Sequence, residues 1–208
     1  MPNGQIVILN GAPRSGKSSL VKVIQETFPG CWINLGVDVG MAMLPSRLQP
    51  GIGLRPGGER PDLEPLVPVL YAALYESIAS HSRLGLNVVA EFGHHERHSR
   101  PLGILPHCAR RLAGLPVLLV GVRCGAETIM ARRRASAATG DRRYVSAGPD
   151  QPVPEPVRAW QAAVHDPGLY DLDVDTGAMT PEACAATIRR RLEEGIRSPT
   201  AFERLAKM

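Results

Sequence analysis

Aromatic residues are scarce in this chain of 208 residues. Phenylalanine, tryptophan and tyrosine together make up 4% of it, whereas all hydrophobic residues make up 44%. The core must therefore be built from Val, Leu, Ile and Ala, which favours a buried parallel sheet beneath helices over an aromatic-rich sandwich. The same scarcity leaves few side chains for stacking on the bases of single-stranded nucleic acid.

Cysteines are also few, and no two of them form a Cys-x-x-Cys pair. This spacing argues against a zinc site or a disulfide framework and predicts reduced, mostly buried thiols in a cytoplasmic protein. No apolar run approaches the roughly 20 residues of a membrane span, and no basic segment of a signal peptide opens the chain. We therefore expect no membrane partner. The four cysteines are Cys31, Cys108, Cys124 and Cys184.

Short apolar runs alternate with segments of helical periodicity along the chain. The predicted strands are residues 5–10, 31–35, 87–90, 116–123 and 172–174. The predicted helices are residues 17–27, 66–82, 102–112, 126–138, 156–164 and 181–196. This order predicts one α/β domain over residues 1–208, with a five-stranded parallel sheet and helices on both faces. A segment rich in proline and glycine, within residues 39–68, is predicted to be an irregular excursion beside the acceptor site rather than a core element.

A phosphate-binding pattern lies between the first predicted strand and the first predicted helix. The segment Gly11-Ala12-Pro13-Arg14-Ser15-Gly16-Lys17-Ser18 fits G-x-x-x-x-G-K-[ST] at every defined position. Glycines let the backbone curl so that its N–H groups surround phosphate oxygens, and the helix N-terminus favours anions. Lys17 is expected to reach the β- and γ-phosphates, and Ser18 to offer its hydroxyl to Mg²⁺. This segment, with Ser19, therefore predicts binding of ATP and Mg²⁺.

Two carboxylates follow predicted strands at the sheet edge where the phosphate loop opens. Asp38 is the candidate general base for an acceptor hydroxyl, although Asp is also a favoured N-cap and could begin a helix over residues 39–44. Glu91 could hold Mg²⁺ through water, orient the acceptor, or be a solvated carboxylate at a strand end. No Asn-Lys-x-Asp motif is present, so a small phosphotransferase is favoured over a GTPase.

Five arginines bracket a Gly140-Asp141 break. Cations beside a hinge suit a lid that closes over ATP phosphates, and we place this lid at residues 126–156. The alternative is a solvated helix face followed by a basic loop. Arg142, in a catalytic role, and Arg134 are the arginines expected to contact phosphate. The five are Arg132, Arg133, Arg134, Arg142 and Arg143.

Three histidines, His94, His95 and His98, lie within residues 93–100. Their spacing does not match H-E-x-x-H, and a phosphoryl-transfer site needs Mg²⁺ on oxygen ligands rather than zinc on imidazoles. We therefore expect this loop to line the acceptor pocket, with His94 as a substrate-binding residue.

With these residues placed, the chain resembles the chloramphenicol phosphotransferase family of P-loop kinases from residue 6 to about residue 188. The resemblance implies a nucleotide-kinase-like three-layer fold and ATP-dependent phosphorylation of a hydroxyl on a small molecule. It also implies that Asp38 occupies the family's base position and that Arg142 and an upstream arginine belong to its lid. Beyond the phosphate loop, the matching segments are Gly36-Val37-Asp38, Val120-Gly121-Val122-Arg123-Cys124, Gly140-Asp141-Arg142, Val164-His165 and Tyr170-Asp171-Leu172-Asp173-Val174-Asp175-Thr176.

Three segments depart from the family pattern, and all of them lie where acceptor or lid contacts are expected. Glu91-Phe92 stands where the family usually has a pair of aspartates, the histidine-containing loop differs, and residues 148–156 form a longer proline-rich insert. The resemblance therefore supports kinase chemistry more strongly than it supports chloramphenicol as the acceptor. A pocket that must hydrogen-bond one particular hydroxyl can reject related compounds, so small changes in its lining can change the acceptor.

We predict an ATP- and Mg²⁺-dependent O-phosphotransferase for a small hydroxylated compound, with an antibiotic such as chloramphenicol as one candidate acceptor. A metabolic kinase for a nucleoside or sugar is the alternative. The net charge of +4 also raises a nucleotide-gated nucleic-acid binder. Arginines gather near the predicted lid and at residues 189–191, beside two glutamates, so no nucleic-acid partner is expected. Association into a homo-oligomer stays open.

Overall fold

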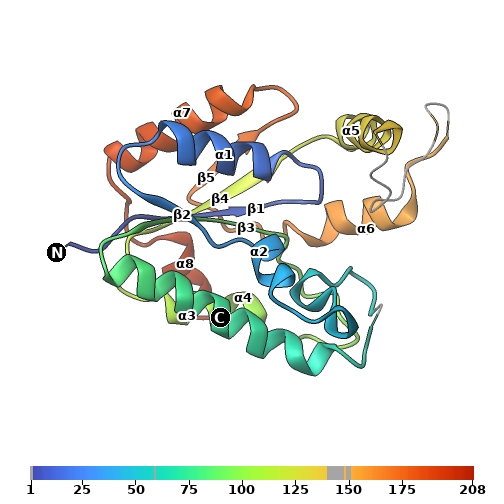
Figure 1. Ribbon diagram of the computed structural model, residues 1–208, viewed down its shortest axis with the longest axis horizontal. Helices are drawn as coiled ribbons and strands as arrows, with labels where there is room; N and C mark the ends of the chain where they lie inside the picture. The colour runs from blue at the N-terminus through green and yellow to red at the C-terminus, as the bar shows by residue number, and fades with distance from the viewer. Residues whose placement is uncertain (1, 59, 140–147, 149–150) are drawn as a thin grey trace.

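Five parallel strands form the centre of the protein (Figure 1). The computed structural model describes residues 2–58, 60–139, 148 and 151–208. The strands lie in the order β2-β3-β1-β4-β5, so β1 is central and pairs with both β3 and β4. This arrangement confirms the predicted parallel sheet. The bounds are β1 (Ile6–Asn10), β2 (Trp32–Asn34), β3 (Asn87–Phe92), β4 (Val117–Arg123) and β5 (Leu172–Asp175).

Helices cover both faces of the sheet, which confirms the three-layer fold (Figure 1). One face carries α1 (Lys17–Thr27) and α7 (Pro181–Glu193). The other carries α3 (Val67–Arg83), α4 (Ile104–Arg111) and α8 (Ala201–Leu205). Strand β1 is buried throughout because alternate side chains enter the two apolar clusters: Ile6 and Ile8 on one face, Val7 and Leu9 on the other.

The remaining elements gather around the carboxyl end of the sheet (Figure 1). They are α2 (Val37–Ala42), α5 (Ala126–Ala138), α6 (Glu155–Ala163) and three short 3₁₀ turns, Ser46–Leu48, Gly51–Gly53 and Glu64–Leu66. Helix α5 and the first residues of α6 belong to the segment predicted as a lid. The central part of that segment, including Arg142 and Arg143, lies outside the described residues.

The excursion before α3 differs from its prediction, because part of it belongs to the core. Ile52, Leu54 and Leu63 are 6%, 2% and 6% exposed and join the apolar cluster beneath α3. Proline and glycine set the turns of this segment, while the apolar side chains between them point inward. The segment is therefore anchored to the domain.

The C-terminal helix α8 was not predicted. Thr200 begins it with a capping box, in which the Thr200 hydroxyl accepts from the Glu203 N–H and the Glu203 carboxylate accepts from the Thr200 N–H. All four cysteines are free in the structure. Three of them are buried, as predicted, whereas Cys31 is exposed. None of the described helices has the length and apolar character that a membrane crossing requires.

Candidate active site

The phosphate loop joins β1 to α1 and takes its shape from two glycines. The Gly11 N–H donates to the Phe92 carbonyl at 3.1 Å. A Cβ on Gly11 would lie 2.6 Å from the Val122 carbonyl oxygen, so the close approach of the loop to β4 requires glycine. Gly16 has a φ of 93°, in the left-handed region that glycine adopts without steric cost, and α1 begins at the next residue.

Lys17 lies inside this loop. Its Nζ donates to the Gly11 carbonyl at 2.8 Å and to the Ala12 carbonyl at 2.9 Å. Burial lowers the pKa of Lys17 to about 8, although the carboxylates of Glu91 and Asp38 act in the opposite direction. The lysine is thus a buried ammonium group whose proton is held less tightly than usual.

Glu91 faces the start of α1 from the end of β3. It stands opposite Leu9 in the parallel register, and its Oε2 accepts from the Ser18 hydroxyl at 2.9 Å. Burial raises the pKa of the Glu91 carboxyl, while Lys17 and the Ser18 hydrogen bond act to lower it. Glu91 is therefore not a solvated carboxylate at a strand end, because it is 7% exposed and bonded to Ser18.

Asp38 lies in the first turn of α2, and Gly36 is the N-cap of that helix. The interpretation of Asp38 as an N-cap is therefore wrong. A Cβ on Gly36 would lie 2.8 Å from Cγ of Glu91, so glycine lets α2 begin directly against the end of β3. The Asp38 carboxylate is exposed and close enough to Lys17 and Glu91 to influence their charges.

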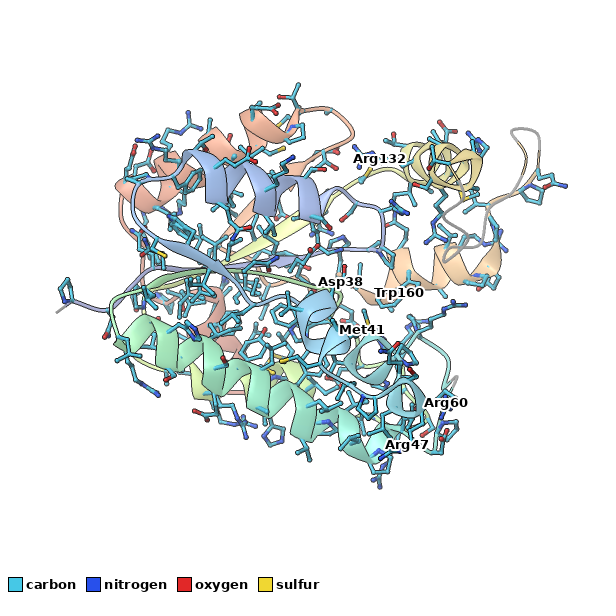
Figure 2. The ribbon with its side chains drawn as sticks, in the orientation of Figure 1. Asp38, Met41, Arg47, Arg60, Arg132 and Trp160 are labelled. Atoms are coloured by element: carbon cyan, nitrogen blue, oxygen red, sulfur yellow. The ribbon has the colours of Figure 1, made fainter. Side chains whose placement is uncertain are left out.

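One cavity of about 900 Å³ contains these groups. Figure 2 shows Asp38, Met41 and Trp160 at the carboxyl end of the sheet, with Arg132 reaching in from α5. The excursion lines this cavity, as predicted, whereas sequence reasoning did not identify the contribution of α6, which supplies Trp160. From the phosphate loop and α1, the lining residues include Gly11, Pro13, Arg14, Gly16, Lys17, Ser18 and Ser19. From other elements, they include Val37, Asp38, Met41, Gln49, Pro50, Ile52, Arg55, Glu91, Arg132, Arg133, Trp160 and Thr176.

Arg132 is bound directly to the phosphate loop. Its guanidinium donates to the Arg14 carbonyl at 3.2 Å and to the Thr176 carbonyl at 2.7 Å. The Thr176 hydroxyl donates to the Ser15 carbonyl, so the residue after β5 holds the loop from the same side. Arg132 and Arg133 line the cavity and Arg134 does not, so the choice of Arg134 among the helix arginines is corrected.

His94 does not line the cavity, and its predicted role in binding substrate is corrected. The side chain is 3% exposed, and its Nε2 is 2.8 Å from the Tyr75 hydroxyl. Its ring lies against Phe92, Tyr71 and Tyr75 in the core. Burial lowers the pKa of His94 to about 3, so the imidazole is neutral at physiological pH.

The neighbouring histidines support the cavity wall rather than line it. The His95 Nε2–H donates to the Leu54 carbonyl at 2.9 Å, and its ring lies edge-on to Trp160 at 5.0 Å between centroids. Within the described part of the chain, no group of His, Cys, Asp and Glu is arranged to hold a metal ion. Of the predicted histidine-containing loop, Gly93 lines the cavity.

The burial of neutral His94 predicts an acid-sensitive stability. An unfolded histidine binds a proton as pH falls through 6.5, whereas folded His94 does so only near pH 3. The unfolded state therefore gains protons first, and stability is lost as pH falls below 6.5. Between pH ~7.5 and ~5.5, His94 should account for a loss of about 1 kcal/mol in the free energy of unfolding.

This loss can be measured by urea unfolding at both pH values. His94→Gln, which cannot take up a proton, should show a loss smaller by that amount. His107→Gln, at an exposed histidine of α4, is the matched control and should behave like the parent. If the free energy of unfolding depended equally on pH in His94→Gln and in the parent, the placement of a neutral His94 in the core would be contradicted.

Solved structures of several kinases share this fold. The APS kinase CysC of Mycobacterium tuberculosis, in complex with AMPPNP and APS, has a TM-score of 0.54 and 18% identity, with 93% of this chain and 99% of that chain covered. Shikimate kinase of Acinetobacter baumannii, in complex with shikimate, has a TM-score of 0.59 and 10% identity, with 92% and 94% covered. At these identities, the similarity shows the fold alone.

Sequence comparisons extend along the same chain. "Putative O-phosphotransferase Rv2636" of Mycobacterium tuberculosis strain H37Rv is 28% identical over 224 aligned positions, which cover 100% of this chain and 90% of the relative. The family model described as "Chloramphenicol phosphotransferase-like protein" matches residues 4–193. The match includes the phosphate loop, Asp38, Glu91 and α5. This protein therefore belongs to the chloramphenicol phosphotransferase-like family.

Proposed function

We propose that this protein is an ATP-dependent O-phosphotransferase that transfers the γ-phosphate to a hydroxyl of a small molecule. The observation that carries this proposal is the cavity, which combines the phosphate loop, the Ser18–Glu91 pair and an exposed carboxylate at Asp38. The family and the mycobacterial relative's name support the reaction class. A similarly folded APS kinase holds AMPPNP and APS, which supports a nucleotide and a small acceptor as the two substrates.

The charges that line the cavity favour a polyanion. Cations outnumber carboxylates, and four of them belong to the phosphate loop (Arg14 and Lys17) or to α5 (Arg132 and Arg133). A nucleoside triphosphate carries about four negative charges, which these groups offset through charge-assisted hydrogen bonds. The cations are Arg14, Lys17, Arg55, Arg132 and Arg133, and the carboxylates are Asp38 and Glu91.

The Ser18–Glu91 pair fits a magnesium ion. The two side chains present a hydroxyl and a carboxylate oxygen 2.9 Å apart beside the phosphate loop, and Mg²⁺ prefers oxygen ligands. Ser18 would bind the ion directly and Glu91 would hold it, directly or through water. When bound, Mg²⁺ would offset the negative charge of the phosphate oxygens.

Asp38 would activate the acceptor. Its carboxylate accepts the proton of the acceptor hydroxyl while the oxygen attacks the γ-phosphorus and the bond to the β-phosphate oxygen breaks. Lys17 and the N–H groups of the phosphate loop stabilise the charge that develops on the phosphoryl oxygens. Helix α5 and residues to 156 would form the lid, with Arg132 already bound to the loop and Arg142 outside the described residues.

We assign to the acceptor the part of the cavity that is lined by the excursion, α2 and α6, where several side chains are apolar. Val37, Met41 and Trp160 face it from α2 and α6, and the excursion adds Pro50 and Ile52. This wall suits a compound with an apolar portion, and chloramphenicol is a candidate because the family model carries its name. Two polar residues of the excursion, Gln49 and Arg55, also line the cavity, so a nucleoside or a sugar-type acceptor is the alternative.

A transfer assay with γ-labelled ATP and Mg²⁺ tests the function. Chloramphenicol, gluconate and a nucleoside such as adenosine serve as acceptors. Labelled chloramphenicol would support the antibiotic assignment, and labelled gluconate or adenosine would support a metabolic kinase. The proposal fails if ATP does not bind, or if ATP binds and a wider set of hydroxylated compounds remains unlabelled.

The free thiols favour a reducing compartment, and we place the reaction in the cytoplasm.

Glu91 should control the magnesium requirement. In Glu91→Gln, the Mg²⁺ concentration for half-maximal transfer should rise by about 10–100-fold, because an amide lacks the carboxylate charge that holds the ion or its water. The measurement is a magnesium titration at fixed ATP. Glu26→Gln, an exposed carboxylate on α1, is the control. An unchanged magnesium requirement would remove Glu91 from this role.

A further inference from the structure

Asn10 interrupts an apolar stripe immediately before the phosphate loop. Ile6 and Ile8 face the cluster beneath α3, and alternation places the Asn10 side chain on the same face. Asn10 is nevertheless polar and 3% exposed. A buried amide is costly unless its hydrogen bonds are satisfied, so its partners are informative.

Three segments from distant parts of the chain meet at this amide. The Asn10 Nδ2 donates to the Val164 carbonyl at 2.8 Å and to the Tyr170 hydroxyl at 3.0 Å. The Asn10 Oδ1 accepts from the His94 N–H at 2.8 Å. Both donors and the acceptor oxygen of the amide are thus used, which an apolar residue could not reproduce.

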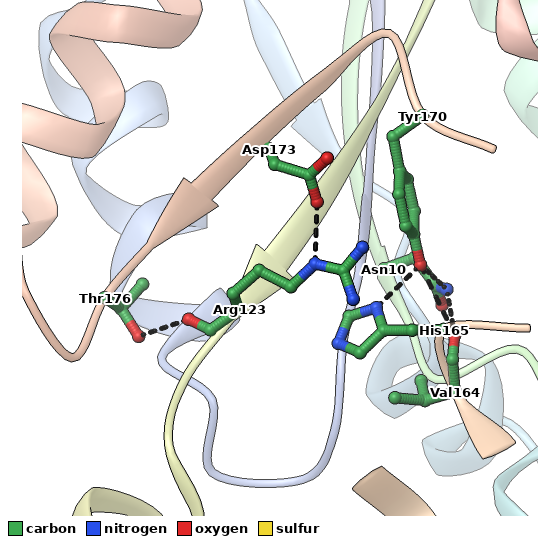
Figure 3. Close-up of polar contacts among 7 residues, drawn as sticks. All are labelled: Asn10, Arg123, Val164, His165, Tyr170, Asp173 and Thr176. Atoms are coloured by element: carbon green, nitrogen blue, oxygen red, sulfur yellow. Dashed lines mark hydrogen bonds and ion pairs between the residues drawn. The ribbon is translucent and has the colours of Figure 1, made fainter. Parts of the chain in front are cut away.

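The Tyr170 hydroxyl is held from several sides (Figure 3). The hydroxyl oxygen lies 2.8 Å from Nδ1 of His165. The Arg123 guanidinium lies over the Tyr170 ring, 5.1 Å from the ring centroid. Arg123 is itself paired with Asp173 at 2.7 Å. A Cβ on Gly121 would lie 2.8 Å from the Tyr170 ring, so glycine in β4 makes room for it.

Val164 connects this cluster to the cavity wall. It is the C-cap of α6, and its N–H donates to the carbonyl of Trp160, one turn earlier. Trp160 lines the cavity, in the part that we assign to the acceptor. At the other end of the connection, Asn10 directly precedes Gly11, whose carbonyl accepts from Lys17 Nζ. One path from Lys17 to Trp160 thus runs through the Asn10 side chain.

We propose that Asn10 is a positioning residue that holds α6, and with it the Trp160 wall of the acceptor end, in a fixed relation to the phosphate loop. A nucleotide that binds Lys17 and the loop would then set the position of Trp160 before the acceptor enters. This inference rests on the proposed function, because it assigns ATP to the loop and the acceptor to the Trp160 side.

The two tryptophans of the chain allow a direct test. In Trp32→Phe, Trp160 is the remaining tryptophan, and its emission should change when MgATP binds. Adding Asn10→Asp keeps an acceptor for the His94 N–H but removes the donors to Val164 and Tyr170. This variant should lose most of the Trp160 response while its ATP affinity, measured by calorimetry, changes by less than about threefold.

Two further variants complete the experiment. Ser82→Ala removes another buried side-chain hydrogen bond, to the Gly4 carbonyl, and should leave the Trp160 response intact. Tyr170→Phe removes one of the Asn10 partners and should reduce the response, which keeps the test decisive if Asn10→Asp does not fold.

The outcomes separate the inference from the proposed function. No ATP binding to the Trp32→Phe parent would overturn both. ATP binding with no change in Trp160 emission would overturn the inference alone. Three other results would also overturn the inference alone. The first is a full Trp160 response in Asn10→Asp, and the second is a full response in Tyr170→Phe when Asn10→Asp does not fold. The third is a loss of response in Ser82→Ala equal to that in Asn10→Asp.

Discussion

Replacing Asp38 by Asn is expected to lower the rate of phosphoryl transfer by about 10²–10⁴-fold, the usual contribution of a general base. The amide has nearly the same shape as the carboxylate but cannot take the proton of the acceptor hydroxyl. Because the Asp38 side chain is exposed and caps no helix, the fold should tolerate the change. The measurement is kcat with the acceptor that the transfer assay identifies.

The affinity for ATP separates this role from a structural one. It should stay within about twofold of the parent, since Asp38 has no assigned contact with the triphosphate. Asp62→Asn, at an exposed carboxylate of the excursion that is paired with Arg60, is the matched control and should transfer normally. Undiminished transfer in Asp38→Asn would exclude the base role, and a loss of ATP binding would point to a structural one.

Replacing Lys17 by Met should produce the second large effect, a fall in transfer of about 10²–10³-fold. Met fills a similar buried volume but lacks the ammonium group that lies inside the phosphate loop. Lys22→Met, at an exposed lysine on α1, is the control. Parental transfer in Lys17→Met would contradict the proposed phosphate contact.

The pH dependence of ATP binding provides an independent check on Lys17. In the protein without nucleotide, the pKa of Lys17 is about 8, so its charged form is lost as pH rises through that value. Phosphate oxygens favour the charged form, and ATP affinity should therefore fall above pH 8, by up to about tenfold per pH unit. Lys17→Met should bind ATP weakly and without this pH dependence. Calorimetry across pH 7–10 measures both.

Local sequence signals were sufficient for the sheet and the phosphate loop. Buried parallel strands are continuous apolar runs, as in residues 6–10 and 117–123. The phosphate loop has a defined sequence pattern, because its backbone requires glycine at positions 11 and 16 for steric reasons. The short helix α8 also carried its signal, because Thr200 and Glu203 have capping-box spacing.

Other parts of the site depend on packing that no local pattern contains. In the sequence, His94 looks like a polar residue that could contact a substrate. In the structure, its ring lies against Phe92 and against Tyr71 and Tyr75 of α3. Likewise, nothing in the run of arginines on α5 indicated that Arg132, rather than Arg134, faces the phosphate loop. That choice depends on the rotation of α5 about its axis, which brings Arg132 to the Arg14 and Thr176 carbonyls.

The anchored excursion has a consequence for how acceptor preference can diverge among relatives. Ile52 and Leu54 are fixed in the core, whereas Gln49 and Arg55 of the same segment are exposed at the cavity. Substitutions at such exposed positions usually change stability by less than about 0.5 kcal/mol. If the proposed function holds, the segment separates positions that maintain the domain from positions that would contact the acceptor, so new specificities could arise by point mutation on an unchanged scaffold.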